Sequence, residues 1–213
     1  MGGPVIIAVD GPAASGKGTL ARRLAAELGY AYLDTGLLYR AVGLALLNSG
    51  RDPADETAAT AAATAFDAAS ADYSDPALRA EETGKAAGTV AAFPLVRAAL
   101  VEVQRQFAAN PPGDKLGAVM DGRDIGTVIC PDATHKFFIE AEIEERARRR
   151  VKELQGRGNA VIPAQVLQEM KERDERDRNR AVAPLAPAAD ASVVNTTNLN
   201  ADATFALAMS LIR

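Results

Sequence analysis

The residues from Gly11 to Thr19, with the sequence GPAASGKGT, are the first candidates for chemistry. Glycines allow successive backbone N–H groups to turn inward around an anion, and a helix N-terminus adds the positive end of its dipole. Lys17 adds a mobile positive charge. This pattern is typical of a P-loop, which binds the phosphates of a nucleotide, provided that a strand precedes the glycines and a helix follows them.

The neighbouring sequence meets that condition. Val5–Val9 is a short apolar run and predicts a buried parallel strand. Leucines recur every four residues between Lys17 and Leu28, and Gly29 follows as a C-cap, so we expect a helix there. Lys17 is the candidate catalytic cation for the β- and γ-phosphates, and the Thr19 hydroxyl is the candidate Mg²⁺ ligand, directly or through a water molecule. The predicted ATP-binding residues are Gly11, Pro12, Ala13, Ala14, Ser15, Gly16, Lys17, Gly18 and Thr19.

Short apolar strands and helices alternate along the rest of the chain. We predict strands at 30–33, 116–120, 135–139 and 192–196, and helices at 34–47, 90–107, 143–155, 163–178 and 201–212, the second of them kinked near Pro94. This alternation predicts an α/β fold in which a parallel sheet is covered by helices on both faces. The alanine-rich, acidic stretch 52–88 has no strand pattern. It is either a helical cover for the core or an inserted subdomain that closes over a substrate.

Composition excludes several functional classes. The 213 residues include one cysteine and one histidine, so two-histidine and multi-cysteine metal sites are impossible. The formal net charge of −4 disfavours binding to nucleic acid, and no apolar run approaches the roughly 20 residues of a membrane span. A cytoplasmic location is expected because cysteine is so scarce. Nothing else in the sequence supports Cys130 and His135 as a nucleophile and its base.

The form of the loop narrows the class further. In the strict P-loop motif, Ser or Thr follows the lysine directly, whereas here Gly18 stands between Lys17 and Thr19. The GKGT form resembles nucleoside monophosphate kinases rather than P-loop GTPases. The guanine-binding pattern Asn-Lys-x-Asp is absent from the sequence, which disfavours a switch or motor protein.

Four further segments are similar to those of bacterial cytidylate kinases, and they occur in that family's order. They are DTGLLYR at 34–40, VAAFPLVR at 90–97, GRDIGTV at 122–128, and RDERDRNR at 173–180, which is followed by PLAPAAD at 184–190. The resemblance implies one P-loop kinase domain over residues 1–213, with a three-layer P-loop NTPase core. Within it we expect a reduced nucleotide-binding insert at 52–99 and a short helical lid at 144–160.

The resemblance also implies an activity, the transfer of the γ-phosphoryl group of ATP to CMP or dCMP with Mg²⁺. Its implied catalytic residues are Lys17, Arg123, Arg146 and Arg150. Its implied CMP ligands are Thr35, Arg40 and Arg123 for the α-phosphate, Arg97 and Asp124 for the cytosine, and Arg173, Asp177 and Arg180 for the sugar and nearby phosphate. The implied partners are these nucleotides alone, without nucleic acid or membrane, and the chain is expected to be a monomer.

Elementary chemistry agrees with that set. An acceptor phosphate is already ionised near neutral pH, so the enzyme needs no strong base and must instead hold two repelling anions in line. The planar fork of arginine suits this task because it can bond two phosphate oxygens at once. A carboxylate such as that of Asp124 can accept a hydrogen bond from the 4-amino group of cytosine, which uracil lacks.

Each charged segment also has a plainer interpretation. Acids and bases alternate over 173–180, which is typical of solvated pairs along a helix, and the basic helix 144–155 is by itself a solvated face. Arg146 and Arg150 lie one helical turn apart, so we favour them over Arg148 as phosphate ligands of a closing lid. Apart from any role in binding, Asp34 and Asp124 are of the type that serves as helix N-cap or turn residues.

One position departs from the family pattern. The serine that helps to hold cytosine is replaced by Gly88, and the neighbouring Thr89 faces a different side. The departure makes UMP an alternative acceptor. A P-loop kinase for another small molecule, or a nucleotide-binding regulator without turnover, remains a further alternative at this point.

Overall fold

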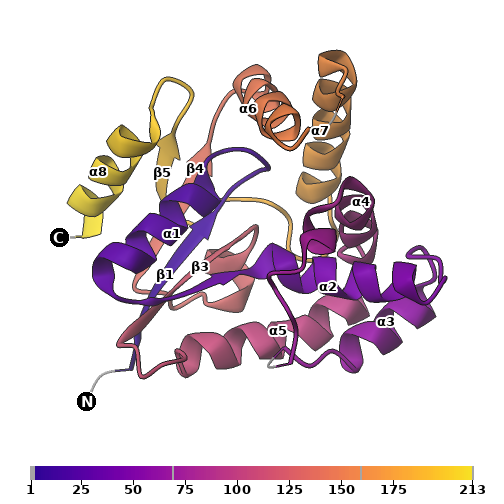
Figure 1. Ribbon diagram of the computed structural model, residues 1–213. Helices are drawn as coiled ribbons and strands as arrows, with labels where there is room; N and C mark the ends of the chain where they lie inside the picture. Colours follow the sequence, from indigo (N-terminus) through magenta and orange to yellow (C-terminus); the bar gives the residue numbers. More distant parts are fainter. Residues whose placement is uncertain (1–2, 69, 159, 213) are drawn as a thin grey trace. The chain divides into compact units, whose positions relative to one another are not determined.

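The computed structural model describes residues 3–68, 70–158 and 160–212. Five strands form one sheet in the order β2-β3-β1-β4-β5 (Figure 1). Their bounds are Val5–Asp10 for β1, Ala31–Asp34 for β2, Gly117–Gly122 for β3, His135–Glu140 for β4 and Ser192–Asn195 for β5. β1 pairs in parallel with β3 and β4, and β4 pairs in parallel with β5. The expected α/β fold with a parallel sheet is therefore confirmed.

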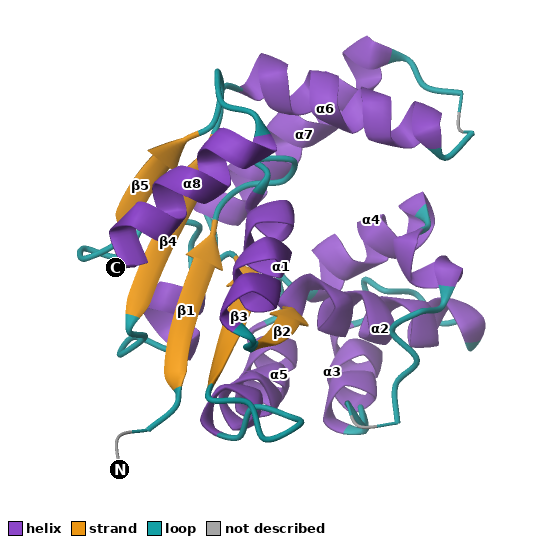
Figure 2. Cartoon of the chain, turned by 60° about the vertical axis from the view of Figure 1, so that its left-hand side comes forward, coloured by secondary structure: helices purple, strands orange, loops and turns teal. Residues whose placement is uncertain are grey.

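The chain divides into two compact units, one formed by Met1–Leu33 with Pro111–Arg213 and the other by Asp34–Asn110. In the first unit, α1 (Lys17–Leu28) and α8 (Ala201–Ile212) lie side by side over one face of the sheet (Figure 2). The buried contacts there include Ile7 and Val9 of β1, Leu24 of α1 and Ala208 of α8. This packing fixes the start of α1, and with it the loop between β1 and α1.

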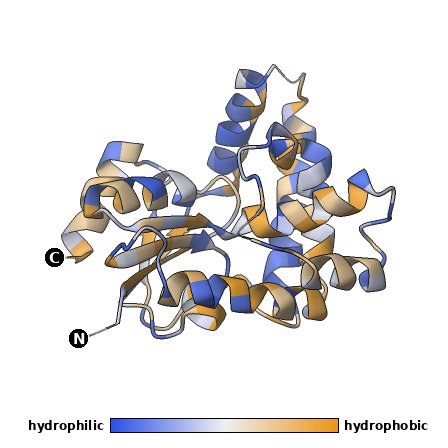
Figure 3. Cartoon of the chain, turned by 60° about the horizontal axis from the view of Figure 1, so that its bottom comes forward, coloured by the Kyte–Doolittle hydropathy of each residue, from blue (hydrophilic) through white to orange (hydrophobic). Residues whose placement is uncertain are grey.

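The first unit also contains two charged helices, α6 (Ile143–Gly156) and α7 (Pro163–Arg178). They pack on each other through apolar residues, among them Ala147, Leu154 and Met170. Figure 3 colours both helices mainly as hydrophilic, because most of their remaining residues are charged. The expected lid at 144–160 covers α6 and the start of the connection to α7, and its residue 159 lies outside the described residues.

In the second unit, the described residues from Thr35 to Asn110 form helices joined by turns and loops. It consists of α2 (Thr35–Asn48), α3 (Glu56–Thr64), the 3-10 helix η1 (Pro76–Arg79), α4 (Glu81–Val90) and α5 (Pro94–Ala109). Small side chains allow close packing: a Cβ on Gly43 of α2 would lie 3.0 Å from the Cβ of Ala86 on α4. The described residues of 52–99 contain no strand, so the alanine-rich stretch forms helices; residue 69 lies outside the described residues.

The largest difference between the predicted and observed elements is at Pro94. The helix predicted over 90–107 is two helices, since α4 ends at Val90 and α5 begins at Pro94, with a bend of 102° between them. Proline holds the preceding residue out of the helical region, and Phe93 is accordingly extended at φ −80° and ψ 123°. The strand predicted from Leu116 begins at Gly117, and Leu116 is exposed. Among the described residues, no single helix is both long and apolar enough to cross a membrane.

Candidate functional site

The loop between β1 and α1 has the backbone that the glycines predict. Gly11 has φ +150°, and a Cβ there would lie 2.1 Å from the carbonyl oxygen of Ile139, so only glycine fits. Gly16 is the left-handed N-cap of α1, with φ +96°, and no described side chain caps this helix end. The first N–H groups of α1 are thus left to an external acceptor, as at an anion site.

The side chains of the loop also suit the binding of an anion. The hydroxyl of Ser15 is buried and has no hydrogen-bond partner among the described residues, which suits a phosphate oxygen as its acceptor. Lys17 begins α1 and is half-buried, while Thr19 lies on the exposed side of the same turn. The nine residues assigned to ATP from the sequence therefore form one continuous loop and first helical turn.

Asp121 is a further candidate site residue, which the sequence did not single out. It stands near the end of β3, the strand beside β1, is buried, and accepts a hydrogen bond of 2.6 Å from the Tyr32 hydroxyl. Its Oδ2 would lie 3.1 Å from a Cβ on Gly18, so the carboxylate approaches the first turn of α1. The apolar run 116–120 that ends in an aspartate beside the P-loop strand was the available signal, because P-loop enzymes hold Mg²⁺ with such a residue.

The loop after β3 carries Arg123 and Asp124 and runs into the short π-helix η2 (Ile125–Ile129). Asp124 occupies the N-cap position of η2 without any capping bond from its own side chain. Asp10, at the end of β1, caps it instead: its two oxygens accept the N–H groups of Ile125 at 2.9 Å and Gly126 at 2.8 Å. By contrast, Asp34 does cap α2, through a 3.1 Å bond from the Gly36 N–H. The N-cap interpretation therefore holds for Asp34 and not for Asp124.

The electrostatics of Asp10 reflect its burial. Burial raises the pKa of its carboxyl group from 3.8 to about 7, against the opposing effect of the two backbone N–H donors. Nearby Asp124 raises the pKa further and Arg123 lowers it. Carboxyl groups with such environments cluster at functional sites.

Arg123 and the end of α7 form a buried cluster of charges. The Arg123 Nε donates to Asp177 at 3.1 Å, and Arg180 is also paired with Asp177. Burial alone would raise the pKa of Asp177, but the charges of Arg123, Arg180 and Arg173 lower it below its ordinary value. The structure thus brings these four predicted CMP ligands together: Arg123 and Arg180 each bind one oxygen of Asp177, and Arg173 is near enough for its charge to act on that carboxylate.

Arg146 and Arg150, which the sequence favours as a pair, have different contacts in the structure. Arg146 is buried, pairs with Asp174 of α7 at 2.5 Å, and donates to the backbone carbonyls of Ala141 and Ala13. Arg150 pairs with Glu153 along its own helix at 2.9 Å. Arg146 therefore reaches the P-loop backbone, whereas the ion pair of Arg150 keeps that side chain on α6.

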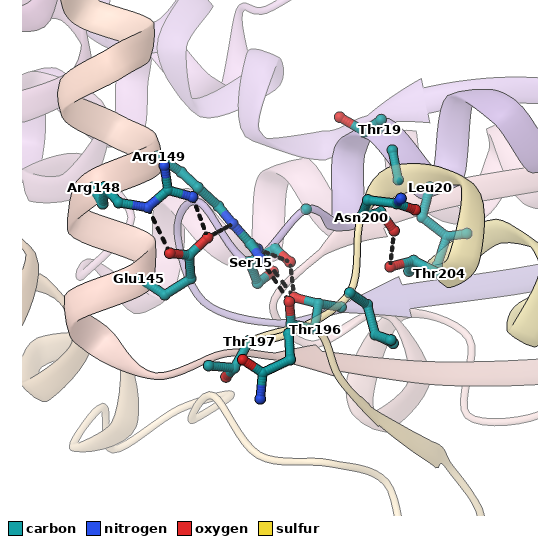
Figure 4. A pocket seen from close by; sticks show the side chains of 14 residues that line it. Ser15, Thr19, Leu20, Glu145, Arg148, Arg149, Thr196, Thr197, Asn200 and Thr204 are labelled. Atoms are coloured by element: carbon teal, nitrogen blue, oxygen red, sulfur yellow. Dashed lines mark hydrogen bonds and ion pairs between the residues drawn. The ribbon is translucent and has the colours of Figure 1, made fainter.

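Arg149 was not predicted, and like Arg146 it joins α6 to the P-loop. Its guanidinium donates to the Ser15 carbonyl at 3.3 Å and to the hydroxyl and carbonyl of Thr196 at 3.0 and 2.6 Å (Figure 4). Glu145 accepts from its Nε at 2.8 Å and also binds the exposed Arg148. Helical spacing alone could not select Arg149, because the choice depends on which face of α6 meets the loop after β5.

These groups border a cavity of about 510 Å³ in the first unit (Figure 4). Ser15, Gly16 and Thr19 lie on one side of it, and the loop from Thr196 to Ala201 lies on another. Arg148 and Arg149 also contribute to the lining. A cavity of this size, bounded by a P-loop and by two arginines, suits a nucleotide.

The second unit holds the remaining predicted CMP ligands. Thr35 is buried at the first position of α2. Arg40 donates to the carbonyls of Leu78 and Ala80 at 2.7 and 3.3 Å. Arg97 is buried, with its guanidinium 5.6 Å from the centre of the Tyr39 ring. Within this unit both arginines are thus held in place by its own backbone or aromatic groups.

The chain is similar in sequence to known proteins over nearly its whole length. The sequence pattern of the cytidylate kinase family matches residues 7–213. The chain is 59% identical to a cytidylate kinase of Paramagnetospirillum magneticum over 207 residues, which cover 97% of each chain. It is 54% identical to a cytidylate kinase of Rhodospirillum rubrum over 208 residues, which cover 98% of this chain and 97% of the other.

Solved structures share the fold at low sequence identity. An uncharacterized protein from Eubacterium ventriosum is 15% identical with a TM-score of 0.56, and the match covers 98% of each chain. A gluconokinase from Sinorhizobium meliloti is 14% identical with a TM-score of 0.50, and the match covers 98% of this chain and 91% of the other. These two similarities concern the fold alone.

Proposed function

The chain belongs to the cytidylate kinase family, and on that basis we propose that it transfers the γ-phosphoryl group of ATP to CMP or dCMP, giving ADP with CDP or dCDP. The observation that carries this proposal is the 59% identity to a cytidylate kinase over nearly the whole of both chains. The P-loop, with an uncapped helix N-terminus and an unpartnered buried serine hydroxyl, supplies the phosphate site that the activity needs.

On the donor side, the P-loop binds the ATP phosphates and the adjoining cavity takes the nucleoside. Lys17 and the N–H groups of α1 stabilise the charge on the transferring group. Family resemblance assigns Arg146 and Arg150 to this phosphate as well. The contacts of Arg149 with Ser15 and Thr196 make it a further candidate.

On the acceptor side, we assign CMP to the residues that the family resemblance implies. The α-phosphate is bound by Thr35, Arg40 and Arg123, and the cytosine by Arg97 and Asp124. Arg173, Asp177 and Arg180 bind the sugar and the nearby phosphate. The lowered pKa of Asp177 keeps its carboxylate ionised and able to accept a hydrogen bond from a sugar hydroxyl.

The residues present also fit Mg²⁺. Among the described residues there is no cluster of three or more His, Cys, Asp or Glu. This suits a cation that keeps several waters and binds substrate phosphates with only one or two protein groups. The buried Asp121 carboxylate and the Thr19 hydroxyl would hold it, and when bound it would neutralise charge on the phosphate oxygens.

The chain's own residues then account for the chemistry without a catalytic histidine. The acceptor phosphate is already an anion, so the protein has to orient two nucleotides, offset their repulsion and keep water out. Transfer to UMP, and nucleotide binding without turnover, are the alternatives. A cytoplasmic monomer is part of the same proposal.

A coupled assay of ADP release with Mg-ATP and a panel of CMP, dCMP, UMP, AMP and GMP tests the proposal. We expect turnover with CMP and dCMP well above that with the other three. Equal turnover with UMP would retain the kinase class and remove Asp124 and Arg97 as cytosine ligands. An absence of turnover with all five would contradict the proposed activity.

Tyr32→Phe should weaken metal binding. The change deletes the hydroxyl that holds Asp121 at 2.6 Å, and a hydrogen bond to a charged group contributes about 1.5–3 kcal/mol. We expect Mn²⁺ affinity of the ADP complex, measured by electron paramagnetic resonance, to fall roughly tenfold or more. Tyr30→Phe is the matched control, because Tyr30 packs over Gly117 in the core. Equal metal affinity in the two variants would exclude the role given to Tyr32.

Gly88→Ser should improve CMP binding. A Cβ at Gly88 meets nothing within 4 Å, so the serine of the family pattern fits without strain. One added hydrogen bond contributes about 0.5–1.5 kcal/mol, which corresponds to a KM for CMP roughly two- to tenfold lower. Gly88→Ala controls for the gain in helix stability that any side chain brings. If both variants change KM alike, the hydroxyl is not a cytosine ligand.

A further inference from the structure

Asp10 joins two segments to which the proposed function gives different tasks. It is the last residue of β1 and directly precedes Gly11, the first residue of the P-loop. Its carboxylate is bound 115 and 116 residues further along the chain, at the N–H groups of Ile125 and Gly126. One buried side chain therefore ties the start of the phosphate loop to the loop that carries Arg123 and Asp124.

The binding geometry assigns Asp10 a positioning task. Each of its two oxygens is occupied by a backbone N–H, at 2.9 and 2.8 Å, and the residue is only 4% exposed. Both oxygens of this carboxylate are therefore engaged by the backbone of the loop after β3. It acts as the N-cap of η2 from a neighbouring strand, which satisfies helix donors that would otherwise be buried without a partner.

This cap leaves the side chain of Asp124 to other partners. Asp124 sits where a helix would normally receive its own cap, yet it makes no capping bond. Gly126 permits the close approach of the loop to Asp10, because a Cβ there would lie 3.5 Å from Asp10 Oδ2 and 3.2 Å from the side chain of Lys136. A glycine therefore keeps the loop close to the carboxylate.

The Arg123 side of the Arg123–Asp124 dipeptide is held by hydrogen bonds of its own. The Arg123 Nε donates to Asp177 of α7 at 3.1 Å, and its Nη1 donates to the Gly122 carbonyl at 3.1 Å. Arg123 and Asp124 thus lie between two anchors, Asp177 on one side and Asp10 on the other. Releasing Asp10 would remove the anchor on the Ile125 and Gly126 side of the loop and leave the anchor at Arg123.

We propose that Asp10 is a positioning residue that fixes Arg123 and Asp124 relative to the P-loop, and thereby sets the affinity for CMP and its preference over UMP. This inference rests on the proposed function, since it takes Arg123 and Asp124 as CMP ligands. It adds a residue that touches neither nucleotide. It also predicts a specific kinetic signature, because the P-loop is itself held by glycine geometry and helix packing rather than by the Asp10 carboxylate.

Asp10→Asn tests the proposal with almost no change of volume. The amide retains one acceptor but places an NH₂ group against the second N–H, so one charge-assisted bond is lost and a donor is left unpaired. We expect KM for CMP to rise roughly 10- to 100-fold and the CMP-to-UMP ratio of kcat/KM to fall, with KM for ATP within about twofold of wild type. Asp202→Asn is the matched control, since Asp202 is an exposed carboxylate paired with Arg23 on the surface.

Gly126→Ala is a second variant for the case in which Asp10→Asn does not fold. It presses a methyl group against Lys136 and the Asp10 carboxylate, and it should raise KM for CMP while KM for ATP stays near that of wild type. Unchanged CMP kinetics in a folded variant would overturn the proposal. An equal rise in both KM values would also overturn it, because that pattern indicates general loss of structure.

Amide hydrogen exchange of the nucleotide-free protein separates this inference from the proposed function. The cap predicts that the Ile125 and Gly126 N–H groups exchange slowly in wild type and in Asp202→Asn, and at least about tenfold faster in Asp10→Asn. If the wild-type protein has no CMP kinase activity but shows this exchange pattern, the proposed function fails while the cap stands. If exchange at both amides is unaffected by Asp10→Asn, the cap itself is excluded.

Discussion

Lys17→Met should lower kcat for CMP phosphorylation by roughly 10²–10³-fold, the loss typical of removing one preorganised group that stabilises transition-state charge. Lys17 is the first residue of α1 and directly follows the left-handed Gly16, and the proposed function assigns its side chain to the transferring phosphate. Methionine keeps the length of the side chain and removes its charge. We therefore expect the thermal midpoint to change little, which a melting curve with and without ADP would show.

Lys152→Met is the control for that variant. It makes the same chemical change on the exposed face of α6. The expected kcat is that of wild type. A comparable loss in both variants would mean that net positive charge matters and that Lys17 has no specific contact with the transferring group.

Breaking the ion pair between Arg146 and Asp174 should destabilise the first unit by about 3–5 kcal/mol, because either single change leaves a buried charge without its partner. The two side chains are 3% and 5% exposed. Arg146 binds the Oδ2 of Asp174, and the Oδ1 of Asp174 has no hydrogen-bond partner among the described residues. Arg146→Met and Asp174→Leu should each lower the midpoint of urea unfolding. The double variant should recover most of the loss, since a pair of well-packed apolar side chains can replace a buried ion pair.

The same double variant decides what Arg146 does in catalysis. The guanidinium bonds of Arg146 to Asp174, Ala141 and Ala13 already engage its Nη2, Nε and Nη1. Since we assign Arg146 to the transferring phosphate, we expect the stable double variant to lose roughly 10²-fold or more in kcat. A stable double variant with kcat within about tenfold of wild type would restrict Arg146 to holding Asp174 and the P-loop backbone.

The fold was largely predictable because its elements have strong local signals. Alternating apolar strands and periodic helices predicted the order of strands and helices, and the glycines at 11 and 16 predicted a loop whose φ angles only glycine adopts easily. The single helix predicted across Pro94 was wrong because Ala91–Phe93 leave the helix before that proline. Pro94 holds Phe93 in an extended conformation, so α4 and α5 are separate helices with a bend of 102° between them.

The site was less predictable, because the choice among similar residues depends on contacts between distant segments. The sequence favoured Arg150 by helical spacing, yet Arg149 is the side chain that meets Thr196, 47 residues away. Asp10 and Asp121 each follow an apolar strand, and nothing local distinguishes them. Pairing of the strands gives one of them the η2 cap and the other the Tyr32 hydroxyl.

The most direct test of the central claim follows the phosphoryl group itself. ATP labelled with ³²P at the γ-position is incubated with the protein, Mg²⁺ and CMP, and the products are separated by thin-layer chromatography. The proposed function predicts label in CDP, in a one-to-one ratio with the ADP formed, and none when CMP is omitted. Label that appears only as inorganic phosphate, at a rate independent of CMP, would contradict it.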